Sequence, residues 1–239
     1  MKKLTKISAA TLLGITALVG ASHSTFAASG LPSTGESKAS IQFLPGTGPV
    51  NPVDPEDPST PLDPTDPNNP TDPGTGNDGA LTLDYVSSID FGSHEVSSNT
   101  EVYSSTSKKP FIQVTDRRGT GAGWTVTASA SQFTNGSAQT LQGAVLTFKN
   151  AEEVSTTLYG APTPETTVTL NADGTSSSKV VSAKVNTGLG TWVNRWFGAT
   201  PNDTASLNNN VTLTVPAGSA TVGSHEATIT WTLTDAPGN

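Results

Sequence analysis

Short stretches of alternating apolar and polar residues recur along the chain after residue 80. They are rich in Val, Ile and Thr, and Gly, Pro, Asn and Ser interrupt them roughly every ten residues. The predicted strands are residues 80–92, 110–116, 123–130, 144–150, 179–185, 210–216 and 226–235. No segment of useful length has the period of an amphipathic helix. The pattern predicts an all-β fold over residues 80–239, a single antiparallel β-sandwich or barrel-like domain.

The last predicted strand has the clearest alternation. Its apolar positions are Ala227, Ile229, Trp231 and Leu233, and threonines occupy the positions between them. Residues 123–130 repeat this pattern, with Trp124 and Val126 on the apolar face. One face of each strand should therefore be buried. We expect Trp124 and Trp231 to belong to the core, where each ring would bury about 200 Å².

The first 27 residues have the build of a secretory signal peptide. Lysines at positions 2, 3 and 6 precede an apolar run over residues 7–19, and small residues follow up to Ala27. The apolar run is shorter than the ~20 residues that a membrane span needs. We expect an exported protein that does not span the membrane.

Residues 28–79 form a predicted disordered lead-in and linker. Prolines recur every third residue from Pro52 to Pro73, with aspartates between them. Three residues per turn is the period of a polyproline II helix, and charge repulsion would stiffen it. At ~3.1 Å per residue the repeat would extend about 70 Å. The expected role is that of a solvated spacer; recognition by an aromatic groove is the less favoured alternative.

Charge and cysteine content narrow the function classes. The chain lacks cysteine, so an exported fold must depend on its apolar core. The formal charge of −8 becomes about −11 without the lysines of residues 1–27. Lys and Arg favour binding to nucleic acid because they release counterions from the phosphates. Anionic lipids and anionic wall polymers would repel a negatively charged protein surface. Nucleic-acid binding and simple ionic adhesion are therefore disfavoured.

Residues suited to catalysis or metal binding are sparse. Only His94 and His225 remain after the signal peptide, which makes a zinc site improbable, and no cofactor is expected. Asp84, Asp90 and Asp116 could supply a carboxylate pair for sugar hydrolysis, but acidic residues at strand ends usually serve turns and solubility. Residues 171–178 could hold calcium, but a turn explains their Asn-Ala-Asp-Gly more simply. We expect no enzymatic activity.

Aromatic residues provide the best candidate contact site. Trp192 and Trp196 flank Arg195 in a stretch without clean alternation, bounded by Gly190 and Gly198. An exposed loop of aromatic residues and arginine is typical of a contact patch. The flat rings could pack on sugars, with the indole N–H groups bonding hydroxyls. The alternative is that both rings belong to the core.

Two Leu-Pro-x-Thr-Gly matches, at residues 31–35 and 44–48, resemble sortase signals. A sortase signal works near a C-terminus, before an apolar span and a basic tail. Cleavage at either match would release the folded domain from the wall-linked peptide. Chance matches arise easily in sequence rich in Pro, Thr, Ser and Gly. We therefore expect neither match to anchor the protein.

The set of motifs resembles the WxL surface proteins of Gram-positive bacteria. Trp124-Thr125-Val126 and Trp231-Thr232-Leu233 look like the paired Trp-x-Leu motifs of that family. Characteristic blocks also match in order: residues 84–92, 114–126, 141–150, 188–198 and 211–237, with residues 40–47 resembling the N-terminal lead-in. Val126 stands where leucine is usual, a small change that should preserve packing.

This resemblance implies non-covalent attachment to peptidoglycan. It also implies a location on the surface or in the wall of a Gram-positive bacterium, with part of the protein secreted. Participation in surface complexes with other cell-surface proteins and adhesion to environmental material or host extracellular material are implied as well. Trp124, Val126, Trp231 and Leu233 would then be mainly structural, with Trp192, Arg195 and Trp196 as the candidate ligand contacts. The alternative is an interaction subunit that a partner surface protein retains on the wall and that binds a host or polysaccharide ligand.

Overall fold

The computed structural model describes residues 34–66 and 70–238. The predicted signal peptide and most of the first sortase-like match lie outside these residues. The chain divides into two units, residues 1–41 and 42–239. The described residues of the first unit belong to no strand. The second unit contains every strand of the described chain and begins well before the domain boundary predicted at residue 80.

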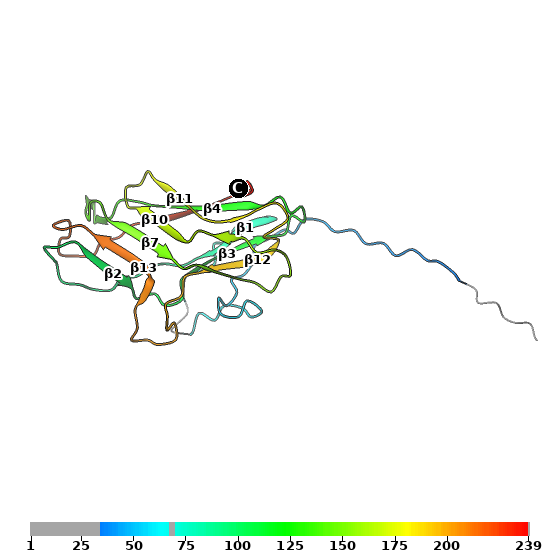
Figure 1. The fold of residues 1–239 in the computed structure, drawn as a ribbon, viewed down its shortest axis with the longest axis horizontal. Helices are drawn as coiled ribbons and strands as arrows, with labels where there is room; N and C mark the ends of the chain where they lie inside the picture. Colours follow the sequence, from blue (N-terminus) through cyan, green and yellow to red (C-terminus); the bar gives the residue numbers. More distant parts are fainter. Residues whose placement is uncertain (1–33, 67–69, 239) are drawn as a thin grey trace, which may run out of the picture. The chain divides into compact units, whose positions relative to one another are not determined.

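Three four-stranded antiparallel sheets and a small hairpin make up the second unit (Figure 1). The first sheet has the order β1 (Leu81–Val86), β3 (Phe111–Asp116), β12 (Gly190–Arg195), β8 (Glu152–Val154). The second has the order β10 (Thr167–Asn171), β7 (Val145–Lys149), β13 (Asn208–Val215), β2 (Glu101–Ser105). The third has the order β14 (Ile229–Thr234), β4 (Trp124–Ala130), β11 (Ser177–Ala183), β9 (Thr163–Pro164). The hairpin pairs β5 (Thr134–Asn135) with β6 (Ala138–Gln139).

The predicted all-β class is confirmed, since the described chain contains strands and no helix. All seven predicted strand segments contain a strand, and β14 and β4 alternate between more and less buried positions as expected. Strands β2, β5, β6, β8, β9, β10 and β12 are additional to the prediction.

One continuous core joins the three sheets. The third sheet contributes Trp124 and Val126, the first contributes Ile112 and Val114, and the second contributes Phe148, with many smaller apolar residues around them. The first and third sheets approach each other at both edges, β1 with β14 and β8 with β9, while β10 of the second sheet contacts β4 and β11. This burial is what holds a cysteine-free domain together.

The proline-rich segment is not an extended spacer in its described part. Val53 and Leu62 pack on a second apolar cluster of Tyr85, Phe111 and Val193, on the face of the first sheet opposite the main core. Because both faces are covered, all six residues of β3 are buried instead of alternating. The prediction of a rod over residues 51–73 is therefore wrong for residues 51–66.

Turn chemistry explains this difference. The side chain of Asp54 accepts the backbone N–H of Glu56, that of Asp57 accepts Ser59, and that of Asp63 accepts Thr65. Aspartate followed by proline favours such Asx turns, which fold the chain locally. The aspartates thus bend the segment. The prediction from the three-residue proline repeat was instead that the aspartates repel one another and stiffen it. An isolated bridge between Val53 and Pro61 closes the resulting loop.

Charged contacts tie this segment to the domain. The side chain of Lys109 is only 1% exposed, and its Nζ lies 2.6 Å from Oε2 of Glu56 and 3.9 Å from Oδ2 of Asp66. The ammonium group of Lys109 holds the pKa of Glu56 below its ordinary value. Arg195 adds a hydrogen bond from Nη1 to the carbonyl of Pro55 at 2.6 Å. Burying a lysine costs free energy unless a carboxylate accompanies it.

Candidate functional site

The two Trp-x-Leu-like motifs lie side by side on neighbouring strands. In the ladder between β14 and β4, Trp231 is opposite Ala128 and Leu233 is opposite Val126. Trp124 and Val126 are fully buried, while Trp231 and Leu233 are half-buried against the core. The ring of Trp231 packs on Trp196 and Phe148, at centroid distances of 5.9 and 6.0 Å. The motif residues thus join two strands and the aromatic part of the core.

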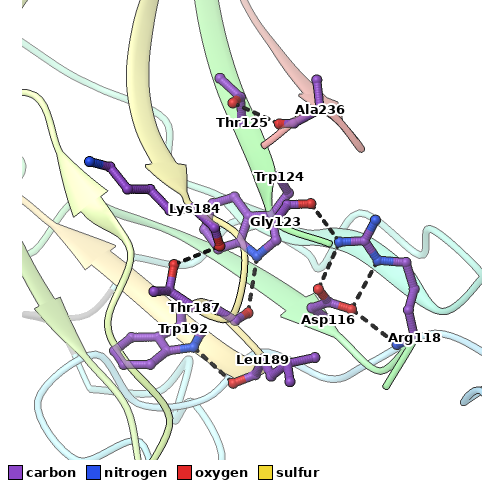
Figure 2. A network of polar contacts seen from close by, with 11 residues as sticks. Asp116, Arg118, Gly123, Trp124, Thr125, Lys184, Thr187, Leu189, Trp192 and Ala236 are labelled. Atoms are coloured by element: carbon purple, nitrogen blue, oxygen red, sulfur yellow. Dashed lines mark hydrogen bonds and ion pairs between the residues drawn. The ribbon is translucent and has the colours of Figure 1, made fainter. Parts of the chain in front are cut away.

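A polar network fixes the position of Trp124 (Figure 2). Its Nε1 donates to the carbonyl of Gly188 at 3.0 Å. The preceding Gly123 has φ +81°, and a Cβ there would lie 2.5 Å from the carbonyl oxygen of Ala183. Only glycine is tolerated at such a position. Arg118 donates to the carbonyl of Gly123 at 2.7 Å and pairs with the carboxylate of Asp116 at 2.8 Å.

Trp192 and Trp196 do not form an exposed loop. Trp192 is 6% exposed and its Nε1 donates to the carbonyl of Leu189 at 3.0 Å, as Figure 2 shows. Trp196 is 1% exposed and packs on Phe148. The expected exposure, on which the predicted ligand contact depended, is wrong for both rings. The reason is that β12 is an inner strand of a sheet with both faces covered, so its sequence shows no clean alternation.

Arg195 is engaged in contacts within the domain. Its Nη2 lies 2.9 Å from Oε2 of Glu152, and its guanidinium lies 4.6 Å from the ring centroid of Phe197. Together with the bond to Pro55, these contacts hold the side chain in one place. Arg195 therefore orients Glu152 and Phe197, which border a pocket just beyond β12.

This pocket, hereafter the asparagine pocket, is the best candidate site for a polar ligand. It has a volume of about 550 Å³ and is lined by Asn150, Glu152, Phe197, Gly198, Ala199, Pro201, Asn209 and Asn210. Asn150, Glu152 and Asn209 are exposed, while Phe197 and Asn210 are half-buried. Three amides, one carboxylate and one aromatic ring thus meet in one hollow of the surface.

Local backbone geometry brings the amides together. Asn150, in the turn between β7 and β8, has φ +57°, in the left-handed region that asparagine tolerates better than most residues. A register shift occurs in the pairing of β13 with β2, between Asn208 and Thr212. Within it Asn209 is exposed and Asn210 is half-buried, while Val211 stays in the core. Asn208 stays buried and anchors this irregularity, because its Nδ2 donates to the carbonyl of Trp196 at 2.8 Å.

Hydrogen bonds then set the orientation of the amides. Asn150 Nδ2 donates to Asn210 Oδ1 at 2.8 Å, and Asn210 Nδ2 donates to the carbonyl of Phe197 at 2.6 Å. Ser104 donates to Asn209 Oδ1 at 2.7 Å. Amides present both donors and acceptors, and the ring offers an apolar face. This combination suits a ligand rich in hydroxyl and acetamido groups.

Sequence reasoning missed most of this pocket. It singled out the stretch around Trp192 and Trp196, but the pocket-lining aromatic residue is Phe197. The run Asn208-Asn209-Asn210 was the available signal, since it leads into the strand predicted at residues 210–216 and asparagine is unfavourable in strands. Asn150 and Glu152 could not be connected to that run from spacing alone.

The aspartates weighed as a carboxylate pair have separate structural roles. Asp84 is buried and accepts hydrogen bonds from Thr115 at 2.6 Å and Gln113 at 3.0 Å. Burial raises the pKa of Asp84, and these hydrogen bonds oppose the rise. Asp116 is held by Arg118, and Asp90 accepts the backbone N–H of Gly92 in a turn.

The predicted turn at residues 171–178 is present. β10 ends at Asn171 and β11 begins at Ser177. The hydroxyl of Ser176 and the backbone N–H groups of Ser176 and Thr175 donate to the carboxylate of Asp173, which lowers its pKa. In the described part of the chain, no three His, Cys, Asp or Glu side chains come together as a metal site would require. Among the same residues, no helix is long and apolar enough to cross a membrane.

The described chain is thus an antiparallel all-β domain with an amide-lined surface pocket. The chain belongs to the WxL domain family, described as surface cell wall-binding, whose model matches residues 30–237. The protein is thus a cell-surface protein with a cell wall-binding domain. No curated protein and no solved structure matched the chain.

Proposed function

We propose that this protein attaches non-covalently to the peptidoglycan of a Gram-positive wall and acts there without catalysis. The supporting observation is the asparagine pocket in a domain of a cell wall-binding family. Peptidoglycan is rich in hydroxyl and acetamido groups, which asparagine side chains can bond in both directions. Participation in surface complexes and in adhesion to host material would follow from display of the domain on the wall.

The chemistry of the pocket supports non-ionic rather than ionic attachment. The chain has a net charge of −8, and Glu152 is the charged residue that lines the pocket. Anionic wall polymers would be repelled, so the proposed contacts are hydrogen bonds and packing of Phe197 on a sugar face. Glu152 would accept from a hydroxyl, with Arg195 holding its carboxylate in position.

A sedimentation assay tests this proposal. Purified protein is mixed with sacculi stripped of secondary polymers, and the bound fraction is measured. Wild type should sediment with the sacculi at low and moderate salt. Phe197→Ala and Asn209→Ala should each weaken binding several-fold, because each removes one contact to the ligand.

Leu158→Ala is the matched control, because Leu158 is fully exposed and does not line the pocket. Thermal melts should show that the variants remain folded. Wild-type protein that stays in the supernatant at low salt would contradict direct peptidoglycan binding. Full binding by both pocket variants would instead contradict the assignment of the site and leave attachment itself intact.

A further inference from the structure

A large cleft opens near the edge where β1 of the first sheet contacts β14 of the third. Its volume is about 1500 Å³. One wall is formed by residues 86–96, which follow the end of β1, and the other by residues 220–229, which lead into β14. Neither residues 87–100 nor residues 216–228 belong to a strand. Loops, and not paired strands, therefore bound this opening.

The lining of the cleft is strongly apolar. The second sheet contributes Leu146 and Val215, and β14 contributes Trp231. Val96 and Val222, on opposite walls, are 54% and 89% exposed. A ligand made mainly of hydroxyl groups would lose hydrogen bonds to water here without replacing them. Exposed apolar surface of this kind usually marks a site where another molecule binds.

The charged residues of the cleft are all acidic. Four carboxylates belong to its lining, those of Asp72, Asp90, Glu95 and Glu226. Among the described residues that line the cleft, none is Lys or Arg. Local contacts hold two of the carboxylates, since Asp72 accepts the backbone N–H of Ser88 and Asp90 that of Gly92, both at 2.9 Å. A cleft lined by one sign of charge concentrates its field and attracts the opposite sign.

We propose that this cleft binds a segment of another protein in which large apolar residues stand beside Lys or Arg. The apolar side chains would enter the cleft, and the basic side chains would pair with its carboxylates. Tyr103 and Trp231 also line the cleft, and their ring faces can attract a cation. The volume exceeds the 300–1,000 Å³ that is usual for a small-molecule site, which favours a peptide segment as the occupant.

The cleft and the asparagine pocket are separate sites. They share no lining residue, and they differ in chemistry, because amides line one while apolar groups and carboxylates line the other. The protein would thus contact the wall through one site and a partner protein through the other. The proposal for the cleft does not depend on what the asparagine pocket binds.

Fluorescence anisotropy with labelled synthetic peptides tests the chemistry of the ligand. The probe is a short peptide of alternating Leu and Lys, and the comparison peptides replace either Lys with Glu or Leu with Ser. Wild-type protein should bind the Leu/Lys peptide at least about tenfold more tightly than either comparison peptide. Equal binding of the Leu/Lys and Leu/Glu peptides, or of the Leu/Lys and Ser/Lys peptides, would overturn the proposal.

Variants at exposed apolar positions test the location of the site. The double variant Val96→Ser, Val222→Ser should bind the Leu/Lys peptide several-fold more weakly, because it removes apolar surface from both walls. Leu158→Ser, Val185→Ser is the matched control, since both residues are exposed and neither lines the cleft. Thermal melts should show that both variants are folded. Equal binding by the two double variants would overturn the assignment of the peptide to this cleft.

Variants at the carboxylates test the role of charge. Glu95→Gln, Glu226→Gln should weaken binding of the Leu/Lys peptide and make it less sensitive to salt. Glu152→Gln, Glu165→Gln changes the net charge equally outside the cleft and should bind like wild type. An equal effect of both pairs would show attraction to the overall charge of the protein and would overturn the proposal.

Light scattering after gel filtration distinguishes a partner protein from a second copy of this chain. Wild type and Val96→Ser, Val222→Ser should have the same oligomeric state at all concentrations. A wild-type dimer that this double variant dissociates would show that a second copy occupies the cleft, and it would overturn binding of a different protein there.

Discussion

Trp124 and Trp196 have equally buried rings but different polar surroundings. Each is 1% exposed. Trp124 Nε1 donates to the carbonyl of Gly188, whereas Trp196 Nε1 has no partner in the described part of the chain. A buried polar group without a partner costs free energy, and a satisfied one contributes modestly. The N–H group should therefore stabilise the fold at one position only.

Replacing each tryptophan with phenylalanine separates the polar contribution from the apolar one. Trp124→Phe should lower the free energy of unfolding by about 1–3 kcal/mol more than Trp196→Phe, because it leaves the Gly188 carbonyl without its donor. Urea denaturation of both variants measures this difference. Equal losses would show that the hydrogen bond of Trp124 contributes nothing.

At the scale of elements, β8 and β12 are joined by an unusual side-chain pair. Asn194 Nδ2 donates to Glu153 Oε1 at 2.5 Å, and Glu153 Oε2 and Asn194 Oδ1 are buried without a partner among the described residues. Burial raises the pKa of Glu153 well above its ordinary value. In the protonated form, its O–H group could donate to Asn194 Oδ1 and satisfy both atoms.

The pair makes stability depend on pH. Folding raises the pKa of Glu153, so its contribution is complete below the ordinary pKa of 4.5 and declines as pH rises toward the folded value. Glu153→Gln keeps a donor at all pH values and should be more stable than wild type at pH 7, with little difference at pH 4. Urea denaturation at the two pH values measures this.

Glu165→Gln is the control for the general effect of removing a carboxylate, since the ion pair of Glu165 with Lys179 is solvent-exposed and contributes little. It should change stability by much less than Glu153→Gln at pH 7. A Glu153→Gln variant that is less stable than wild type at both pH values would contradict the acid–amide pair.

At the scale of the whole molecule, the proline-rich segment is part of the folded domain. It covers the outer face of the first sheet, where Tyr85 stacks on Phe111 at a centroid distance of 4.4 Å. Lys109 connects the segment to this sheet from a buried position. Residues 51–66 therefore do not act as an extended rod that holds the domain at a distance from the wall.

Lys109→Ala should loosen the segment. The substitution removes the ammonium group that pairs with Glu56, so residues 51–66 should become more accessible and the domain should melt at a lower temperature. Limited proteolysis with sequencing of the cut sites measures the accessibility. Lys108→Ala, one residue away and outside this ion pair, is the matched control. Equal cleavage of the two variants would contradict the role of Lys109.

The anionic character of the chain also predicts how attachment responds to salt. Screening weakens attraction between opposite charges, and it relieves repulsion between like charges. With a net charge of −8, the protein should remain on stripped sacculi as salt rises. Bound fractions across a salt series measure this, and a steep loss of binding would indicate an ionic contact that the asparagine pocket does not contain.

The sequence alone determined the all-β class, the family resemblance and the buried face of β4 and β14. These properties depend on local alternation of apolar and polar residues and on the order of motifs, both of which can be read from the sequence. Trp124 and Val126 lie where a strand with one apolar face places them.

Only the tertiary structure decided which surfaces are covered. Trp192 and Trp196 lie in a stretch whose opposite face is covered by a distant segment, so alternation could not show their burial. The turns of the proline repeat are local, but the packing of Val53 and Leu62 on the first sheet is a long-range contact. Asn150 and Asn210 meet because separate strands place them together. Such long-range contacts bring together residues that carry no shared local pattern, and for that reason sequence patterning could not determine them.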